Sequence, residues 1–503
     1  MEQLNGLSIN HLYHLAPELT LIIAAVVMTL IDLFLPNKTS RHTLGGLALV
    51  AFAVSAFFLI VRLGADEPIS LLNGSYRVDD FGNLLKLAFL VASALIVTMS
   101  LGSMKEEEPH VGEYYSLMLA ALVGAMVMTS TADLITLFVG LELLSITSYI
   151  LVGLRKKNLQ SNEGAFKYLV LGGISSATLL YGMSFLYGTT GSTNLALIKQ
   201  GLIENGPSFP ALIYLALFLI IAGIGFKIAA APFHTWAPDV YQGAPTPVTA
   251  FLAVVSKAAA FAMLFRFIFD VFFNIALSDQ YSFRDDIFLT LSVLASTAMV
   301  IGNVLALRQN NVKRLFAYSG VANAGYLLVP IALQFSLVHY INFSEFYYYL
   351  IAYLFMNIGA FAAVMMLERS TGSTEVHQFA GLYHRAPRTA IAMTLIILSL
   401  AGLPITGGFF GKLFILFGTM QSKQYALGAI LIGTSVLGFY YYFGIIRQMF
   451  MRADADSKDV QGTVGQHITL WICAVAGVLI GLFPQWILEY VNKVFSIAVD
   501  LFV

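Results

Sequence analysis

Long apolar runs separated by short polar stretches are the feature that most restricts how this chain can fold. The hydrocarbon core of a bilayer is about 30 Å thick, so a helix of roughly 20 apolar residues crosses it once. Backbone polar groups in lipid must bond within their own segment, and the alternation of a barrel strand is absent, so the runs are predicted to be helices. About fourteen runs are long enough, centred near residues 26, 53, 91, 121, 142, 176, 220, 259, 296, 322, 355, 402, 437 and 478.

The composition agrees with a membrane location. Hydrophobic residues make up 58% of the chain and charged residues 11%, whereas soluble domains carry about 25% charged residues. The prediction is therefore an all-α polytopic membrane protein whose surface largely faces lipid, with residues 1–503 forming one integral membrane domain. The longest polar gaps, near residues 64–79 and 187–208, are predicted to be loops. A net charge of −1 gives no sign of nucleic acid binding.

The charges of the loops predict the orientation, because cytoplasmic loops are enriched in Lys and Arg. Both termini are predicted to lie outside, as an even number of helices requires, and a bacterial inner (plasma) membrane is expected, with a thylakoid or mitochondrial inner membrane as the alternative. The loops after odd-numbered helices hold fifteen of the 27 basic residues and those after even-numbered helices hold six. The fifteen are Lys38, Arg41, Lys105, Arg155, Lys156, Lys157, Arg308, Lys313, Arg314, Arg369, Arg385, Arg388, Arg447, Arg452 and Lys458.

Four charged residues fall near the middle of predicted helices: Glu142, Lys227, Lys257 and Lys412. A lysine at a helix centre costs about 2.5–3.5 kcal/mol, so such residues face partners or water and mark proton pathways. Glu142 is about ten residues from either helix end, too deep for a short side chain to reach water. It is a candidate proton site, with a structural ion pair or a protonated core carboxyl as the alternative. For each lysine the alternative is a structural charge, and Lys227 has a further one, extension to the near interface.

Two of these lysines lie beside helix breaks. Lys227 precedes Pro232 in LFLIIAGIGFKIAAAPF, and Lys412 follows the LPITGG break at 403–408 in LIILSLAGLPITGGFFGK. Proline frees a carbonyl, and free carbonyls at depth survive only beside a polar cavity. Paired interruptions of this kind indicate a repeat-built transporter with a site at mid-membrane.

Two further residues are candidates for the same pathway. Lys167 lies close to the cytoplasmic end of its helix, where it either takes part in proton transfer or extends to the interface. His234 borders the first break and either relays protons or caps the backbone. Other charges in the spans are predicted to be structural. Arg266 and Asp270 are spaced as an i, i+4 pair, Lys86 lies near an interface, and Asp133 is placed to cap the N-terminus of its helix.

The hypothesis is that protons pass along a line of buried groups from Glu142 and Lys227 through Lys257 to Lys412. The chain itself lacks a redox centre or an ATP site: the single cysteine, Cys473, cannot hold an iron–sulfur cluster, and no Walker or dinucleotide motif occurs. Moving one charge across 100 mV costs about 2.3 kcal/mol, so the energy must come from partner chains or an ion gradient. No cofactor or metal is expected on this chain.

Several segments resemble the antiporter-like membrane subunits of respiratory complex I over nearly the whole chain. The most specific is GIGFKIAAAPFHTWAPDVYQGAPTPVTAFLAVVSKAAA, and the form HTWAPDVYQGAPTPV, with FAGLYHRAP before the last break, is most similar to the N type. The resemblance implies fourteen helices with two inverted five-helix repeats, each with a broken helix. It also implies that Glu142 and Lys227 match the family's coupling pair, Lys257 its central lysine, Lys412 the lysine of the second repeat and Lys167 a further family lysine.

The same resemblance implies boundaries and partners. Helices 1–3 would span about residues 1–110, the repeats 111–273 and 284–452, and the last helix 465–503. The partners would be other membrane subunits of complex I, the antiporter-like L and M types, the small J and K types and the A type, together with lipid. NADH or another donor, FMN, iron–sulfur clusters and quinone would be bound by partner subunits. Helix 10 (GVANAGYLLV) departs from the pattern because no acid matches Glu142.

These observations predict a proton-translocating subunit of a multi-subunit NADH:quinone oxidoreductase. The first alternative is a cation/proton antiporter subunit of a related complex without redox partners. The second is a scaffold whose buried charges only pair with one another. The pumping stoichiometry, the quinone, the electron donor and a separate proton exit do not follow from the sequence.

Overall fold

The computed structural model describes residues 9–36, 40–64, 67–102, 110–273, 275–277, 282–333, 342–452, 459–496 and 500. In these ranges the chain is built from helices and one short hairpin. Lys38, Lys105 and Lys458, which the charge count placed in loops, lie outside the described residues.

Thirteen helices of the described chain are long and apolar enough to cross a membrane. The broken pair α17 (Pro387–Ala401) and α18 (Gly407–Gln421) adds one more crossing, which confirms the fourteen expected from the sequence. The thirteen are α2 (Ala16–Phe34), α3 (His42–Ile60), α4 (Asp80–Ser100), α5 (Val111–Ser130), α6 (Leu134–Val152), α7 (Leu159–Thr190), α9 (Pro210–Lys227), the continuous α11 (Thr246–Phe251), η3 (Leu252–Ser256), α12 (Lys257–Phe265) and η4 (Arg266–Phe272), α13 (Phe283–Ala306), α14 (Val312–Ala332), α15 (Asn342–Thr371), α19 (Tyr425–Met451) and α20 (Val464–Leu482).

Short elements occupy stretches that were predicted to be loops or part of a longer helix. The gap near 64–79 forms the antiparallel hairpin of β1 (Ile69–Leu71) and β2 (Tyr76–Val78), and the gap near 187–208 contains helix α8 (Leu195–Asn205). The prediction of plain loops there was wrong, because polar turn residues do not exclude short elements that pair or pack locally. The remaining short elements are α1 (Ile9–His14), η2 (Gly206–Ser208), α10 (Ala237–Gly243), η5 (Val376–Phe379), α16 (Leu382–Arg385) and α21 (Pro484–Val494).

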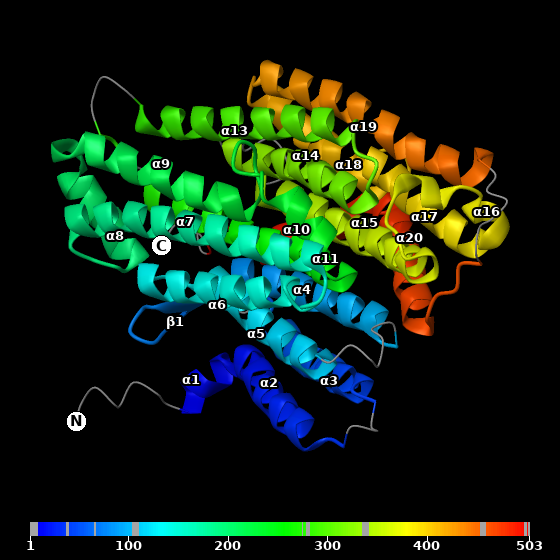
Figure 1. The fold of residues 1–503 in the computed structure, drawn as a ribbon. Helices are drawn as coiled ribbons and strands as arrows, with labels where there is room; N and C mark the ends of the chain where they lie inside the picture. The colour runs from blue at the N-terminus through cyan, green and yellow to red at the C-terminus, as the bar shows by residue number, and fades with distance from the viewer. Residues whose placement is uncertain are drawn as a thin grey trace.

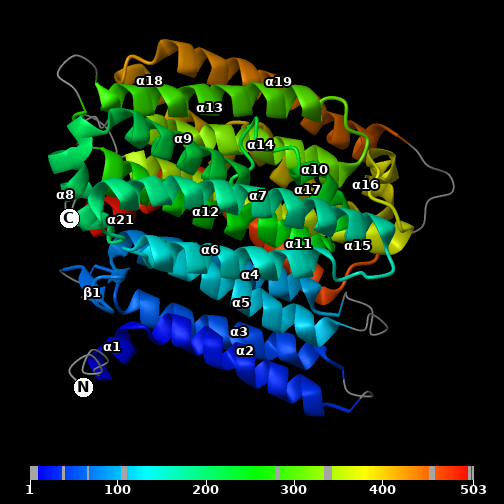
Figure 2. The ribbon, with the colours of Figure 1, turned by 60° about the vertical axis from the view of Figure 1, so that its left-hand side comes forward.

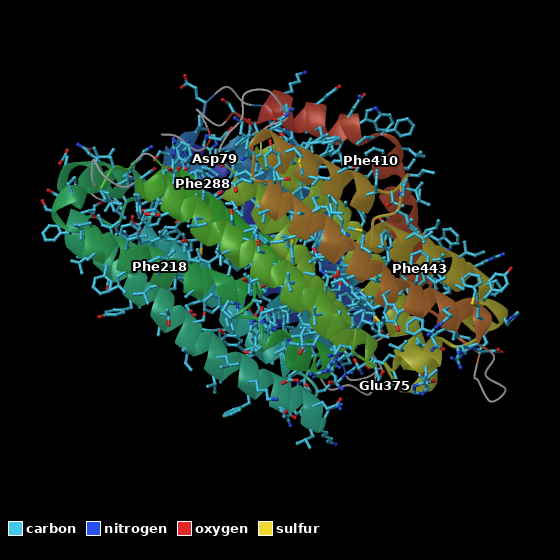
Figure 3. All side chains as sticks on the ribbon, turned by 90° about the horizontal axis from the view of Figure 1, so that it is seen from above. Asp79, Phe218, Phe288, Glu375, Phe410 and Phe443 are labelled. Carbon is cyan, nitrogen blue, oxygen red and sulfur yellow. The ribbon has the colours of Figure 1, made fainter. Side chains whose placement is uncertain are left out.

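The crossing helices run side by side, so the molecule has two ends (Figure 1). α1, the β1–β2 hairpin, α8 and α21 gather at one end, and α16 lies at the other (Figures 1 and 2). Asp79 and Glu375 mark the same two ends when the molecule is seen from above (Figure 3). The first and last described helices therefore share an end, as an even number of crossings requires.

Two loops at opposite ends of the molecule have the same sequence and the same bonding. Residues 190–193 and 371–374 both read TGST, and Gly191 and Gly372 both have φ +74°, a left-handed conformation that glycine adopts without strain. The Leu134 amide donates to the Thr193 carbonyl (2.9 Å), and the Val312 amide to the Thr374 carbonyl (2.8 Å).

The caps at these loops also match. Asp133 caps α6 and bridges Asn194, while Asn311 caps α14 and bridges Glu375. This confirms the expected cap role of Asp133, whose carboxylate accepts from the Ile135 and Thr136 amides. Successive crossings alternate in direction, so units five crossings apart run in opposite senses, as inverted repeats do.

The outer surface is apolar. Phe218 on α9 and Phe443 on α19 are 50% and 42% exposed and lie on outward-facing helices (Figure 3). One face of α6 is also exposed and carries Ile135, Val139 and Ile146. Such faces meet lipid or neighbouring membrane chains, because a water-facing surface would carry far more charge. The interior of the bundle positions the charged residues described next.

Candidate functional site: a line of buried lysines

Lys227 is the last residue of α9, where the crossing breaks before α10. Its side chain is 4% exposed, so it does not extend to the interface. The ammonium donates to the Ser145 hydroxyl (2.6 Å) and the Tyr149 hydroxyl (3.3 Å) of α6. Ser145 in turn donates to the Leu141 carbonyl (2.5 Å), which leaves its lone pair directed at the lysine. The first lysine is thus held by neutral hydroxyls.

Glu142 lies one turn before Ser145 on the same face of α6, because residues i and i+3 are neighbours on a helix. It forms no direct ion pair with Lys227 within 4.0 Å, and its Oε1 atom is buried without a hydrogen-bond partner among the described residues. The acid therefore lies on the helix whose Ser145 and Tyr149 hydroxyls bind Lys227, without a direct bond to the lysine.

Lys257 begins α12 directly after the π-helical turn η3, a distortion often found at functional sites. It is 2% exposed, and its ammonium donates to the main-chain carbonyl of Gly320 on α14 (2.9 Å). It also lies 5.9 Å from the centre of the Tyr241 ring. The central lysine thus joins the middle of the Thr246–Phe272 crossing to the middle of α14.

Lys412 lies in α18, five residues after that helix begins beyond the second break. Its ammonium reaches back to the carbonyls of Leu400 (3.2 Å) and Ala401 (3.4 Å), which the end of α17 leaves free, and it lies 4.9 Å from the centre of the Tyr326 ring. The side chain is 8% exposed. The break therefore supplies the acceptors for this buried charge.

Polar side chains lie on and around the part of α14 between Gly320, whose carbonyl binds Lys257, and Tyr326, whose ring lies beside Lys412. Asn323 donates to the Ser319 main-chain carbonyl (2.9 Å) and accepts from the Tyr349 hydroxyl (2.6 Å). Ser319 also bonds to Tyr442, and the rings of Tyr349 and Tyr326 lie 6.4 Å apart. Sequence reasoning missed these residues, because a neutral Asn, Ser or Tyr in a span carries no charge signal. The one available signal was the unusual polarity of GVANAGY.

Aromatic rings separate Lys227 from Lys257. The Lys227 ammonium lies 6.0 Å from the centre of the Tyr168 ring, which stacks on Trp236 at 4.5 Å. Trp236 is also in edge contact with Tyr241 (6.4 Å), the ring beside Lys257. Tyr241 has a buried hydroxyl with no hydrogen-bond partner among the described residues. The first part of the line is therefore less polar than the second.

Lys167 lies apart from these buried contacts. Its ammonium pairs with Glu163 (2.6 Å) and Asp239 (2.7 Å), and its side chain is 40% exposed. Asp239 also pairs with Arg314 (2.5 Å). Partial burial acts to raise the pKa of Asp239, but hydrogen bonds from Lys167 and Arg314 outweigh it and hold that pKa below its ordinary value. Within the described residues, the Lys167 ammonium thus pairs with carboxylates and not with the groups that surround the other predicted lysines.

His234 lies inside the first break and is 7% exposed. Its Nδ1 atom is buried without a hydrogen-bond partner in the described part of the chain, and its ring centre is 6.1 Å from that of Tyr318 on α14. The histidine thus lies between the broken helix and α14.

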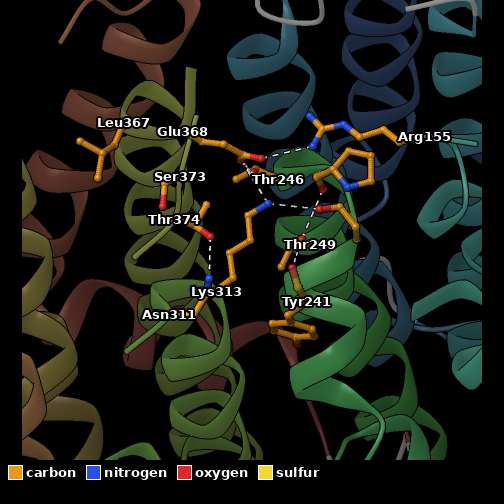
Figure 4. A network of polar contacts seen from close by, with 12 residues as sticks. Arg155, Tyr241, Thr246, Thr249, Asn311, Lys313, Leu367, Glu368, Ser373 and Thr374 are labelled. Carbon is orange, nitrogen blue, oxygen red and sulfur yellow. Dashed lines mark hydrogen bonds and ion pairs between the residues drawn. The ribbon is translucent and has the colours of Figure 1, made fainter. Parts of the chain in front are cut away.

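An ion cluster surrounds buried Lys313 at the start of α14 (Figure 4). Glu368 pairs with Lys313 (3.1 Å) and Arg155 (3.2 Å) and accepts from Thr246. Lys313 is 1% exposed and lies in α14, so its assignment to a loop was wrong. The Asn311 cap begins α14 two residues earlier, and the helix carries Lys313 inward.

The charges expected to be structural are paired. Arg266 bonds Asp270 at 3.5 Å as predicted, but its stronger partner is Asp79 at 2.6 Å. Lys86 is 1% exposed and pairs with Glu18 (2.7 Å). These pairs occur near the end that carries the β1–β2 hairpin, away from the broken helices.

Buried lysines beside broken helices in a multi-pass bundle define a class of transport proteins with a mid-membrane site. The family described as "NADH:quinone oxidoreductase/Mrp antiporter, TM" matches residues 131–438. A protein named NADH-quinone oxidoreductase subunit N from Paenibacillus sp. (strain JDR-2) is 50% identical over 512 residues, covering 97% of each chain. One of the same name from Bacillus anthracis is 42% identical over 496 residues, again covering 97% of each.

A solved structure agrees with these relatives. A chain in the structure of respiratory complex I from Thermus thermophilus with bound Aureothin superposes with a TM-score of 0.78 at 30% identity, covering 94% of this chain and 98% of that one. The chain belongs to the NADH:quinone oxidoreductase/Mrp antiporter family of membrane subunits. The predicted resemblance is thereby confirmed.

Proposed function

We propose that this chain is the proton-translocating membrane subunit of an NADH:quinone oxidoreductase, and that protons pass through Glu142, Lys227, Lys257 and Lys412. One observation carries the proposal: the three lysines are buried, yet among the described residues each ammonium bonds to hydroxyls or carbonyls and to no carboxylate. A lysine locked on an acid keeps its proton, whereas one held by neutral acceptors can release it. The alternative of merely paired structural charges is disfavoured by the same contacts.

In this proposal Glu142 controls the first transfer. When its carboxylate approaches Lys227 through Ser145, the ammonium is stabilised, and when it withdraws the proton moves on toward Lys257. The hydrogen bonds of Ser319, Asn323 and the neighbouring tyrosines then favour transfer toward Lys412. Lys167 and His234 belong to the proposal as peripheral members: Lys167 at the end of α7 that is rich in charge, and His234 within the break.

The energy would come from partner subunits. Relatives that align over 97% of the chain are named NADH-quinone oxidoreductase subunit N, and this name supports quinone reduction as the driving reaction. In the proposal, NADH, FMN, iron–sulfur clusters and quinone are bound by other chains. In the described ranges no group of three or more His, Cys, Asp or Glu residues is arranged to hold a metal ion. The proposed partners are the L, M, J, K and A types, in a bacterial plasma membrane with both termini outside. The division into repeats at 111–273 and 284–452 is supported by the matched TGST loops.

The test is Lys227→Ala in the intact complex, with exposed Lys157→Ala as the matched control. A blue-native gel establishes assembly, and NADH-driven acidification of inside-out membrane vesicles measures pumping. We expect about a 100-fold loss of pumping for Lys227→Ala, a typical effect of removing a proton-transfer group, and wild-type pumping for the control. Full pumping by an assembled Lys227→Ala complex would show that the chain is a scaffold and that Lys227 does not transfer protons.

The antiporter alternative is tested in the same vesicles. Proton movement driven by a sodium gradient without quinone-coupled activity favours a cation/proton antiporter. Migration of the chain in a large NADH-active assembly, with pumping that needs quinone, favours the proposed function.

A further inference from the structure

Gly320 occupies the position in the second repeat that Glu142 occupies in the first. Both residues come nine positions after their helix caps, since Asp133 caps α6 and Asn311 caps α14. The paired loop bonds align the two helix starts residue for residue. The second repeat therefore has a glycine where the first has its acid.

The surroundings of Gly320 are unusual for a glycine inside a helix. Its carbonyl accepts from the Lys257 ammonium at 2.9 Å. A Cβ atom added at this residue would lie 2.9 Å from that Nζ atom and 3.3 Å from the Tyr353 hydroxyl, and no other group lies within 4 Å. The space that a side chain would occupy is thus the space that the ammonium uses. Most other glycines of α14 and its neighbours instead contact packed side chains or backbone, as Gly325 and Gly302 do.

We propose that Gly320 is a positioning residue for proton transfer between the repeats: the absent side chain lets Lys257 reach the main chain of α14, where the first repeat would have an acid. This rests on the proposed function, because it assumes that Lys257 carries protons. The carbonyl holds the ammonium without competing for its proton, since an amide oxygen is not a base at neutral pH.

The strength of the bond between Lys257 and Gly320 depends on whether the lysine carries its proton. A hydrogen bond from an ammonium is roughly twice as strong as one from a neutral amine. The bond to Gly320 therefore weakens when Lys257 loses its proton, and the lysine is released from α14. Ser319 is the neighbouring residue on that helix. Its carbonyl accepts a hydrogen bond from Asn323, which in turn accepts one from Tyr349. Gly320 thus holds the charged lysine where the polar residues of the second repeat begin.

The decisive variant is Gly320→Ala, which leaves every charged residue in place but puts a methyl group against the ammonium. Gly433→Ala in α19 is the matched control, because a Cβ there meets nothing within 4 Å. In inside-out vesicles, Gly320→Ala should lower the number of protons pumped per NADH about tenfold. This factor corresponds to the lower end of the range for losing a hydrogen bond to a charged group. The control should pump like the wild type.

The pH profile separates positioning from a structural effect. Gly320→Asp places a carboxylate beside the ammonium and should move the pH of half-maximal pumping upward, whereas Gly320→Ala should move it downward. Equal profiles for Gly320→Ala, Gly320→Asp and Gly433→Ala would overturn the proposal. If those variants pump normally while Lys257→Ala does not, only the role of Gly320 fails. Normal pumping by Lys257→Ala would overturn the relay itself.

Misassembly of Gly320→Ala is also informative. Only the Lys257 ammonium and the Tyr353 hydroxyl are near enough to clash with the added methyl group. The double variant Gly320→Ala, Lys257→Ala should then assemble, because the tighter of the two contacts, with the ammonium at 2.9 Å, is gone. Failure of the double variant to assemble would show that the glycine serves helix packing and would overturn the proposal.

Discussion

The two repeats hold their lysines in different ways. In the first, Lys227 bonds to the side chains of Ser145 and Tyr149, on the helix face that also carries Glu142. In the second, Lys412 bonds to the free carbonyls of Leu400 and Ala401. The C-terminal end of a helix carries partial negative charge, so the end of α17 stabilises a cation there without a carboxylate.

This difference indicates a division of work. An acid can move or change its protonation, so the proton affinity of the first lysine is adjustable. Main-chain carbonyls at a fixed helix end offer the second lysine a constant environment. We infer that the first repeat responds to the energy source and that the second receives what the first releases.

Replacing Glu142 with glutamine tests this difference between the repeats most strongly, because it is expected to cause the largest loss of pumping. The amide keeps the size of the side chain but cannot ionise, so Lys227 loses its adjustable partner. Pumping in vesicles should fall about 100-fold, as for other proton-transfer groups, while the complex still assembles on a blue-native gel. Wild-type pumping would mean that both repeats work without an acid, and the division of work would be wrong.

Lys412 gives the next largest effect. Lys412→Arg keeps a positive charge for the Leu400 and Ala401 carbonyls but cannot deprotonate in a protein. Lys412→Ala leaves those buried carbonyls without their cation. We expect Lys412→Arg to retain about tenfold more pumping than Lys412→Ala, a difference that corresponds to one charged hydrogen bond. The measurement is acidification per NADH oxidised, and equal loss in both variants would show that a fixed positive charge at this site does not support pumping.

Ser145 tests the side-chain support in the first repeat. Ser145→Ala removes the nearer of the two acceptors of Lys227 but leaves Tyr149, so pumping should fall about fivefold, the equivalent of roughly 1 kcal/mol for one hydrogen bond. The matched control is Ser184→Ala, since Ser184 is exposed on α7 and donates to the Tyr181 carbonyl of the same helix. No change in pumping would show that the hydroxyl does not link Glu142 to Lys227.

Much of this arrangement follows from the sequence. The long apolar runs predicted the crossings, and Pro232 and the LPITGG segment predicted the breaks beside Lys227 and Lys412. These features are local: a run of apolar residues or a proline acts on its own stretch of backbone. Their physical consequences are therefore visible without tertiary contacts.

The contacts between distant helices could not be predicted from the sequence. The carbonyl that binds Lys257 belongs to Gly320, a residue with no polar side chain to notice. Burial of Lys313 with Glu368 depends on where α14 and α15 meet, and the Asn323–Tyr349 bond joins two spans that each look apolar. Such contacts are set by packing, and a single sequence carries no separate signal for them.

Asp239 gives the smallest expected effect and tests how the repeats are joined. It pairs with Lys167 of α7 and with Arg314 of α14, so it links the two halves near the surface. Asp239→Asn should lower the free energy of unfolding by about 0.5 kcal/mol, since partly exposed pairs contribute little. Thermal unfolding of the purified complex measures this, with exposed Glu204→Gln on α8 as the control.

The pH dependence of that loss identifies its cause. The pKa of Asp239 in the folded chain lies below its ordinary value because Lys167 and Arg314 hydrogen-bond to the carboxylate. The stabilisation is therefore complete above the pKa of a free aspartate, about 4, and disappears only as the pH falls through the lowered folded value. The difference between wild type and Asp239→Asn should stay constant between about pH 6 and 8. A difference that vanished within that range would point to a histidine, and Asp239 would not join the repeats through its charge.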